Sequence, residues 1–209
     1  MIELLVHSFV TFFVILDPPG TAAIFLGLTQ DKAVAARRAS AVRGVAVATG
    51  VLVGFALIGE LLLAALGISL PAFRLAGGIL LFLLATDMVF ARHTGLRSTT
   101  DMEDEEAERR RDISVFPLAI PLLAGPGAIT SVMLLMARAD GDLAAQAVVL
   151  STLLAVMAIS LASLFAAGRL ARTLGVTGAN VASRLLGIIL AALAAQFVLD
   201  GVRQSFGIG

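Results

Sequence analysis

Six apolar stretches, each about as long as a bilayer is thick, constrain this chain more than any other feature. A helix needs roughly 20 apolar residues to cross a hydrocarbon core about 30 Å thick. The runs are continuous rather than alternating, which favours helices over the strands of an outer-membrane barrel. The sequence therefore predicts an all-α membrane protein with six transmembrane helices. We expect them at 4–28, 44–67, 69–91, 113–137, 143–167 and 181–202.

Composition supports this class and excludes several others. The chain is 59% hydrophobic and 14% charged, and its mean hydropathy is +1.00. A formal net charge of zero argues against nucleic-acid binding, which needs clustered basic residues. No cysteine is present, which excludes disulfides and thiolate metal sites. Motifs for nucleotide, peptide or ester hydrolysis are absent. We expect a protein that is not an enzyme, holds no cofactor or metal, and has lipids and small solutes as partners.

Basic residues are unevenly divided among the connections. Connections one, three and five hold 11 of the 15 Lys and Arg, and such loops face the cytoplasm. Both termini are then outside, and residues 1–23 lack the basic start of a cleaved signal peptide. The sequence divides into a first repeat at 1–91, a charged cytoplasmic linker at 92–112 and a second repeat at 113–209. The basic residues are Lys32, Arg37, Arg38, Arg43, Arg92, Arg97, Arg109, Arg110, Arg111, Arg169 and Arg172.

The two halves of the chain resemble each other. RLAGGILLFLLATDMV from Arg74 and RLLGIILAALAAQFVLDGV from Arg184 share their opening at an offset of 110 residues, and DPPG at 17–20 matches AGPG at 124–127 at an offset of 107. Three helices per repeat is an odd number, so the second repeat must enter the membrane from the opposite side. Inverted repeats with Gly/Pro-interrupted helices at matching positions are typical of secondary transporters.

The two interruptions predict helices one and four broken near mid-membrane. Proline removes a backbone donor and glycine permits unusual φ, so each motif ends one half-helix and starts another. The amides that begin a half-helix suit a carboxylate, and the carbonyls that end one suit an ammonium. The alternative is that Asp17 caps the second half-helix and the prolines only kink packed helices. A site for a small zwitterion would comprise Asp17, Pro18, Pro19, Gly20, Thr21, Gly125, Pro126, Gly127 and Thr130.

Charged residues inside the spans are candidates for ion coupling or gating, because they are expensive to bury. The predicted topology places Arg74 with Asp200 on the outer side and Asp87 with Arg184 on the cytoplasmic side. Two cross-paired bridges would act as alternating gates or as static clamps. The carboxylates of Asp17 and Glu60 are candidates for a proton or cation site. We expect His7 to face lipid or to cap its helix.

Four blocks, DPPGTAAIFLGLT, FRLAGGILLFLLATDM, FPLAIPLLAGPGAIT and SRLLGIILAALAAQFVLDGV, resemble those of the MarC family of bacterial inner-membrane proteins. The similarity covers the whole chain except the acidic linker. It implies six helices, a location in the bacterial inner membrane and transport of small neutral amino acids such as glycine and alanine. One position departs from the family's first block, D-P-x-G-N-x-P, because Thr21 and Ala23 stand where Asn and Pro are usual.

The leading hypothesis is therefore a secondary transporter of small neutral amino acids or similar solutes, with proton coupling open. A small-solute channel would share the broken helices but would show flux without saturation or coupling. A membrane scaffold or enzyme is a third alternative, although few facing polar side chains are available for catalysis. The oligomeric state stays open.

Overall fold

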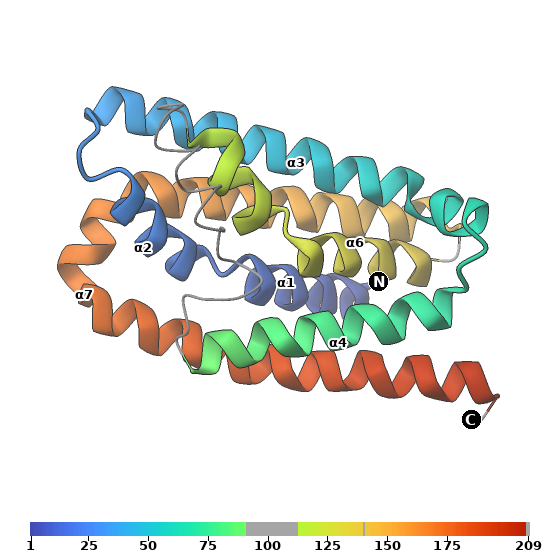
Figure 1. Ribbon diagram of the computed structural model, residues 1–209. Helices are drawn as coiled ribbons and strands as arrows, with labels where there is room; N and C mark the ends of the chain where they lie inside the picture. The colour runs from blue at the N-terminus through green and yellow to red at the C-terminus, as the bar shows by residue number, and fades with distance from the viewer. Residues whose placement is uncertain (91–112, 140, 208–209) are drawn as a thin grey trace.

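Helices account for all regular structure in the residues that the computed structural model describes, which are 1–90, 113–139 and 141–207. The predicted all-α class is therefore confirmed. The linker predicted at 92–112 lies outside the described residues. In chain order the elements are α1 (Ile2–Leu16), α2 (Pro18–Leu28), α3 (Val34–Ala65), α4 (Leu70–Val89), the π-helix η1 (Ser114–Leu123), α6 (Pro126–Arg138) and α7 (Leu143–Phe206) (Figure 1).

Five helical segments are long and apolar enough to cross a membrane, and η1 with α6 makes a sixth if this bent pair counts as one span. They follow the order of the six predicted stretches. The largest difference is at the second stretch, predicted at 44–67, because α3 already begins at Val34. Residues 34–43, assigned to the first connection, are rich in Ala and Arg, which are strong helix formers. The helix therefore extends beyond its apolar part.

The last two predicted helices form one long element that reverses direction. α7 runs from Leu143 to Phe206, and its only non-helical backbone is at Gly175, with φ 65° and ψ 176°. Only glycine adopts that conformation without large strain. Figure 1 shows α7 turning back there. The connection predicted at 168–180 is consequently helical on both sides of a single glycine.

The second arm of α7 (Asn180–Phe206) packs antiparallel to α4 through glycines. A Cβ added to Gly201 would lie 2.9 Å from the backbone nitrogen of Leu75, and one added to Gly78 would lie 2.9 Å from that of Val198. Small residues at such a contact let two backbones approach closely. The two matching stretches of the sequence, which begin at Arg74 and at Arg184, are therefore direct neighbours.

The interior of the bundle is formed by α1, α2 and α6. In the span Ile2–Leu28, 61% of the most apolar window is buried, compared with 28% in α3. Nine of the 13 residues of α6 are buried. α3, α4 and α7 surround these helices and carry most of the exposed large apolar side chains, as expected of surfaces in contact with lipid. Both sequence interruptions thus lie on interior helices.

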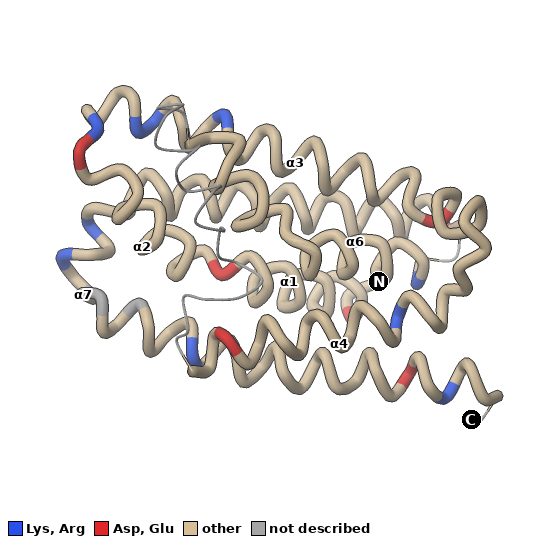
Figure 2. Tube along the Cα trace, in the orientation of Figure 1, with Lys and Arg blue, Asp and Glu red and all other residues tan. Residues whose placement is uncertain are grey.

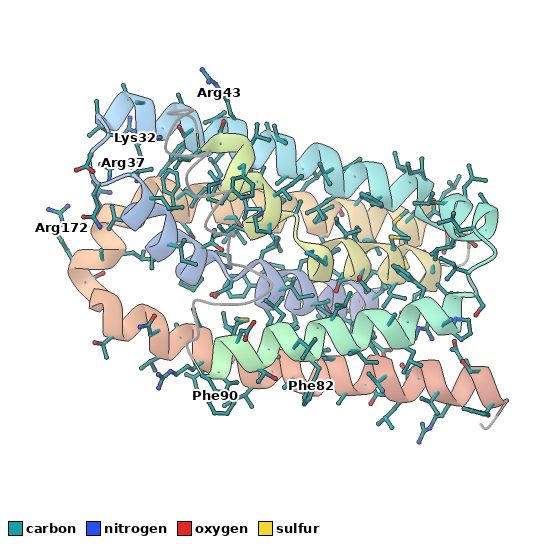
Figure 3. All side chains as sticks on the ribbon, in the orientation of Figure 1. Lys32, Arg37, Arg43, Phe82, Phe90 and Arg172 are labelled. Carbon is teal, nitrogen blue, oxygen red and sulfur yellow. The ribbon has the colours of Figure 1, made fainter. Side chains whose placement is uncertain are left out.

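The two ends of the bundle differ in charge. We call the end where α1 begins and α6 and α7 end the terminal end, and the end where α2 meets α3 and α7 reverses the loop end (Figure 1). Lys and Arg gather at the loop end (Figure 2). The side chains of Lys32, Arg37, Arg43 and Arg172 all lie there (Figure 3). Connections one and five, which the sequence predicts on the same side of the membrane, therefore lie at the same end of the bundle.

Candidate functional site

The first break is Asp17, which separates α1 from α2. Its backbone is left-handed, with φ 44° and ψ 64°, a region that Asp enters more readily than most residues. The Gly20 N–H donates to Asp17 Oδ1 at 3.1 Å, and the Thr21 N–H donates to the Asp17 carbonyl at 2.8 Å. Pro18 and Pro19 have no N–H to satisfy. Every amide of the first turn of α2 is therefore accounted for.

Other polar groups of this break are also engaged. The Ser183 hydroxyl on the second arm of α7 donates to Asp17 Oδ2 at 2.8 Å, and the Thr21 hydroxyl donates to the Leu16 carbonyl at 2.8 Å. Asp17 is 1% exposed. A Cβ at Gly20 would collide with the Asp17 carboxylate and with the Ser183 hydroxyl. The expectation of open amides at this break is wrong, and the capping alternative describes its geometry.

The second break lies at Ala124 and Gly125, between η1 and α6. The two helices meet at 55°, and no side chain caps α6. The Ile129 N–H reaches the Gly125 carbonyl at 3.1 Å, but no acceptor among the described residues reaches the amides of Gly127 and Ala128. The N-terminus of α6 therefore has two amides with no acceptor among the described residues.

Close contact explains why α6 has no side-chain cap. A Cβ on Gly125, the N-cap residue, would lie 2.5 Å from the carbonyl oxygen of Pro121, so no capping side chain fits. Pro117 and Pro121 lack a backbone N–H. η1 is a π-helix, in which an N–H donates to the carbonyl five residues earlier. The Ala124 N–H accordingly donates five residues back, to the Ala119 carbonyl, at 2.8 Å.

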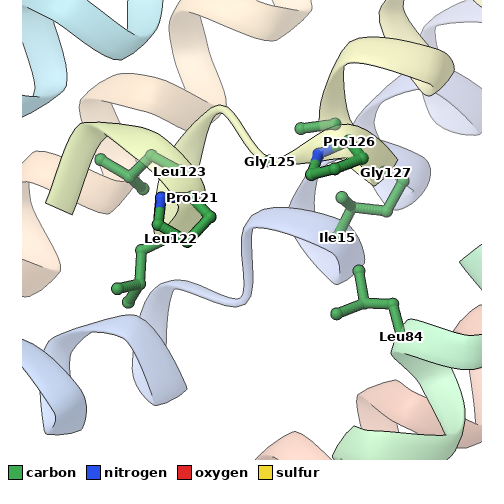
Figure 4. A pocket seen from close by; sticks show the side chains of 9 residues that line it. Ile15, Leu84, Pro121, Leu122, Leu123, Gly125, Pro126 and Gly127 are labelled. Carbon is green, nitrogen blue, oxygen red and sulfur yellow. The ribbon is translucent and has the colours of Figure 1, made fainter. Parts of the chain in front are cut away.

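A small apolar pocket lies directly at the second break (Figure 4). α1 contributes Ile15 and α4 contributes Leu84, and the remaining lining comes from the end of η1 and the first turn of α6. Its volume of about 10 Å³ corresponds to about one water molecule. An amino acid would enter only if the surrounding helices moved apart. The lining residues are Ile15, Leu84, Pro121, Leu122, Leu123, Gly125, Pro126, Gly127 and Ala128.

The structure divides the predicted site residues between two environments. Gly125, Pro126 and Gly127 line the pocket, whereas the residues of the DPPGT motif do not. Thr130 is buried one turn further along α6, with its methyl group against Gly77. Ile15 and Leu84 were not predicted. A sequence motif for them is absent, because they are ordinary core residues brought to the pocket by packing.

The predicted cross-paired bridges are not the ones that form. Asp200 pairs with Arg138 at 3.3 Å instead of Arg74, and no described ion pair joins Asp87 to Arg184. His7 does not cap α1, whose N-cap is Met1; its Nε2 lies 3.0 Å from an Arg138 guanidinium nitrogen, and its side chain is half-buried. Glu60 and Arg184 are exposed. The sequence placed Arg138 in a connection, although a basic residue in the last turn of a helix is a recognisable signal.

The comparisons with known proteins identify the family. The model of the MarC family of integral membrane proteins matches residues 2–206. The chain belongs to the MarC family. It is 34% identical to UPF0056 membrane protein YvbG of Bacillus subtilis, over 99% of this chain and 97% of the relative. It is 32% identical to UPF0056 membrane protein YhcE of Escherichia coli, over 95% and 91%.

This membership confirms the predicted resemblance and makes the chain a multi-pass integral membrane protein. A third relative, UPF0056 membrane protein MJ1677 of Methanocaldococcus jannaschii, is 36% identical over 97% of both chains. No solved structure matches the chain.

Proposed function

We propose that this MarC family member is a secondary carrier of small neutral amino acids of the size of glycine and alanine. The observation that carries the proposal is the junction of an uncapped helix N-terminus with an apolar pocket inside the bundle. The amides of Gly127 and Ala128 have no acceptor among the described residues, and both residues line the pocket. Such amides, with the positive end of the helix dipole, suit a carboxylate.

The pocket also supports selection by size. Its remaining walls are Ile15, Leu84 and the end of η1, which offer no side chain that would pair with a polar substituent. A methyl group suits such walls, and a charged side chain would be desolvated there without compensation. The substrate ammonium would be bound by backbone carbonyls at the same break. Neutral amino acids with little or no side chain are therefore the proposed class.

The arrangement of the two repeats supports alternating access. α4 and the second arm of α7 lie antiparallel and in close contact at Gly78 and Gly201, as expected of equivalent helices from inverted repeats. In this class of carrier one repeat rocks against the other around a central site. We propose that such a movement widens the small pocket toward one side at a time.

The orientation and the energy source belong to the same proposal. The basic loop end would face the cytoplasm under the positive-inside rule, with both termini outside a bacterial inner membrane. A proton gradient is the proposed driving force. Asp17 is already committed to Gly20 and Ser183, so Glu60 is the more suitable carboxylate to carry the proton. The protein would need no cofactor and would not act as an enzyme.

The test is uptake of labelled alanine and glycine into proteoliposomes, with and without an imposed proton gradient. We expect saturable, gradient-driven uptake by the native protein and its loss in Gly127→Leu, because the added side chain fills the pocket. Asp17→Asn should retain uptake, since Asn also caps helices. Gly50→Leu is the matched control, because nothing lies within 4 Å of a Cβ at Gly50.

The possible outcomes separate the carrier from the alternatives. Flux that rises linearly with concentration and ignores the gradient would indicate a channel. Absence of uptake for both amino acids in folded native protein would contradict the proposed substrate class. Equal loss of uptake in Gly50→Leu and Gly127→Leu would contradict a substrate site at the second break.

A further inference from the structure

A cluster of charged side chains lies at the terminal end, away from the pocket. It joins Arg74 of α4, Arg138 of α6, Asp200 of α7 and His7 of α1. Gly201 packs against the backbone of α4 at Leu75, so Asp200 and Arg74 occupy adjoining turns. Two guanidinium groups thus lie near a single aspartate.

Arg74 is the unusual member of the cluster. It is only 5% exposed, and its Nε has no hydrogen-bond partner among the described residues. A buried guanidinium is strongly destabilising unless an anion or several acceptors compensate for its lost hydration. Arg74 follows Leu70 by four residues, which places it about 6 Å below the start of α4. It therefore lies about one helical turn below the terminal end.

Asp200 is not available to compensate Arg74. Its Oδ2 accepts from Arg138 at 3.3 Å, and its Oδ1 accepts from the Gln196 side-chain amide at 2.7 Å. Both carboxylate oxygens are thus engaged by other donors. No described ion pair includes Arg74.

Arg138 is held in place by three neighbours. Besides Asp200 it lies 3.0 Å from His7 Nε2 and 5.6 Å from the ring centre of Phe197. A guanidinium is only a donor, so His7 Nε2 must be the acceptor and the imidazole is neutral. Two arginines and one aspartate leave the group with one unbalanced positive charge. Glu3, the other nearby acid, is exposed in the first turn of α1.

We propose that Arg74 and Arg138 form a carboxylate-binding site at the terminal end, where the substrate's carboxylate is first bound. Arginine presents paired donors in a plane that matches the two oxygens of a carboxylate. A phosphodiester headgroup is bulkier, and the burial of Arg74 leaves little room for its two substituents. The identity of the ligand as an amino acid rests on the proposed function, whereas the anion site itself does not.

The site is tested by thermal unfolding of the purified full-length protein in detergent, followed by circular dichroism at equal ionic strength. Replacing chloride with acetate should raise the midpoint by about 3 °C for a ligand well above its Kd. Alanine should act like acetate, and alaninamide, which lacks the carboxylate, should not. Arg203→Gln is the matched control, because Arg203 is an exposed arginine at the same end of α7.

Variants at Arg74 decide the result. Arg74→Gln should abolish the acetate shift, and Arg74→Lys, which keeps the charge but loses the planar fork, should at least halve it. An equal shift in native protein and Arg74→Lys, or no shift in native protein, would overturn the proposal. Stabilisation by phosphatidylglycerol but not by acetate would also overturn it, in favour of a lipid site. If Arg74→Gln does not fold, Arg74→Lys and Arg138→Gln carry the test.

Failure of this site and failure of the carrier are distinguishable. An Arg74-dependent acetate shift without alanine uptake would retain the anion site and reject the proposed transport. Saturable alanine uptake by native protein that shows no acetate shift would retain the carrier and reject the site. If both are correct, Arg74→Lys should raise the KM for alanine uptake by about tenfold while Arg203→Gln leaves it unchanged.

Discussion

The first and second breaks begin with similar sequences but present opposite chemistry to their surroundings. At the first, Asp17 caps α2 and bonds Ser183, so the helix start is satisfied within the protein. At the second, Gly125 carries no side chain, and Gly127 and Ala128, whose amides have no acceptor among the described residues, line a pocket. A Pro-Gly interruption therefore leaves a capped or an uncapped helix start according to which residue occupies the N-cap position.

Removal of the cap at the first break should have the largest effect on stability. Asp17→Ala should lower the free energy of unfolding by about 3 kcal/mol, which combines the lost cap with the strain of Ala in a left-handed conformation. Asp17→Asn should cost about 1 kcal/mol, because Asn still caps and tolerates that conformation. The measurement is reversible unfolding in mixed detergent micelles. Equal costs for the two variants would contradict a capping role.

The second break should resist any side chain at its N-cap position. Gly125→Ala should cost about 2 kcal/mol of unfolding free energy, because its Cβ would press against a backbone carbonyl that cannot rotate away. Gly54→Ala is the control, because nothing lies within 4 Å of a Cβ there, and it should be neutral or slightly stabilising. If Gly125→Ala were as stable as the native protein, the contact with Pro121 would not explain the uncapped helix.

Enlarging the pocket at the second break should change which amino acids are taken up, if the proposed site is correct. Leu84→Ala removes a wall of the pocket without touching the first break, so valine uptake relative to alanine uptake should rise about tenfold. Leu63→Ala, which removes a buried leucine of α3 that does not line the pocket, controls for general loosening. The ratio is measured in one proteoliposome preparation with both labelled substrates. An equal rise of this ratio in Leu63→Ala would contradict the proposal that the pocket selects substrates by size.

Much of the fold could be predicted from the sequence, because bilayer thickness and helix geometry fix where apolar segments must lie. The positions of both interruptions followed from the special backbone chemistry of Pro and Gly. Whether each helix start is capped could not be predicted. Ser183 is 166 residues from Asp17 in sequence, and the contact between Gly125 and the Pro121 carbonyl is seen only in the folded chain. The prediction that Asp200 pairs with Arg74 was wrong for the same reason, because Asp200 pairs with Arg138. Pairings between distant helices depend on their rotation, which apolar patterning leaves undetermined.

The smallest expected effect concerns the hydrogen bond that ties the first break to the second arm of α7. Ser183→Ala should cost about 1 kcal/mol, within the range measured for hydrogen bonds between membrane helices. Ser205→Ala is the matched control, because among the described residues its hydroxyl donates to the Gly201 carbonyl of its own helix. If the first break is a fixed joint, Ser183→Ala should leave alanine uptake unchanged in proportion to folded protein. A change in KM without a change in stability would mean that this break moves during transport, and the contrast between the two breaks would then be one of degree.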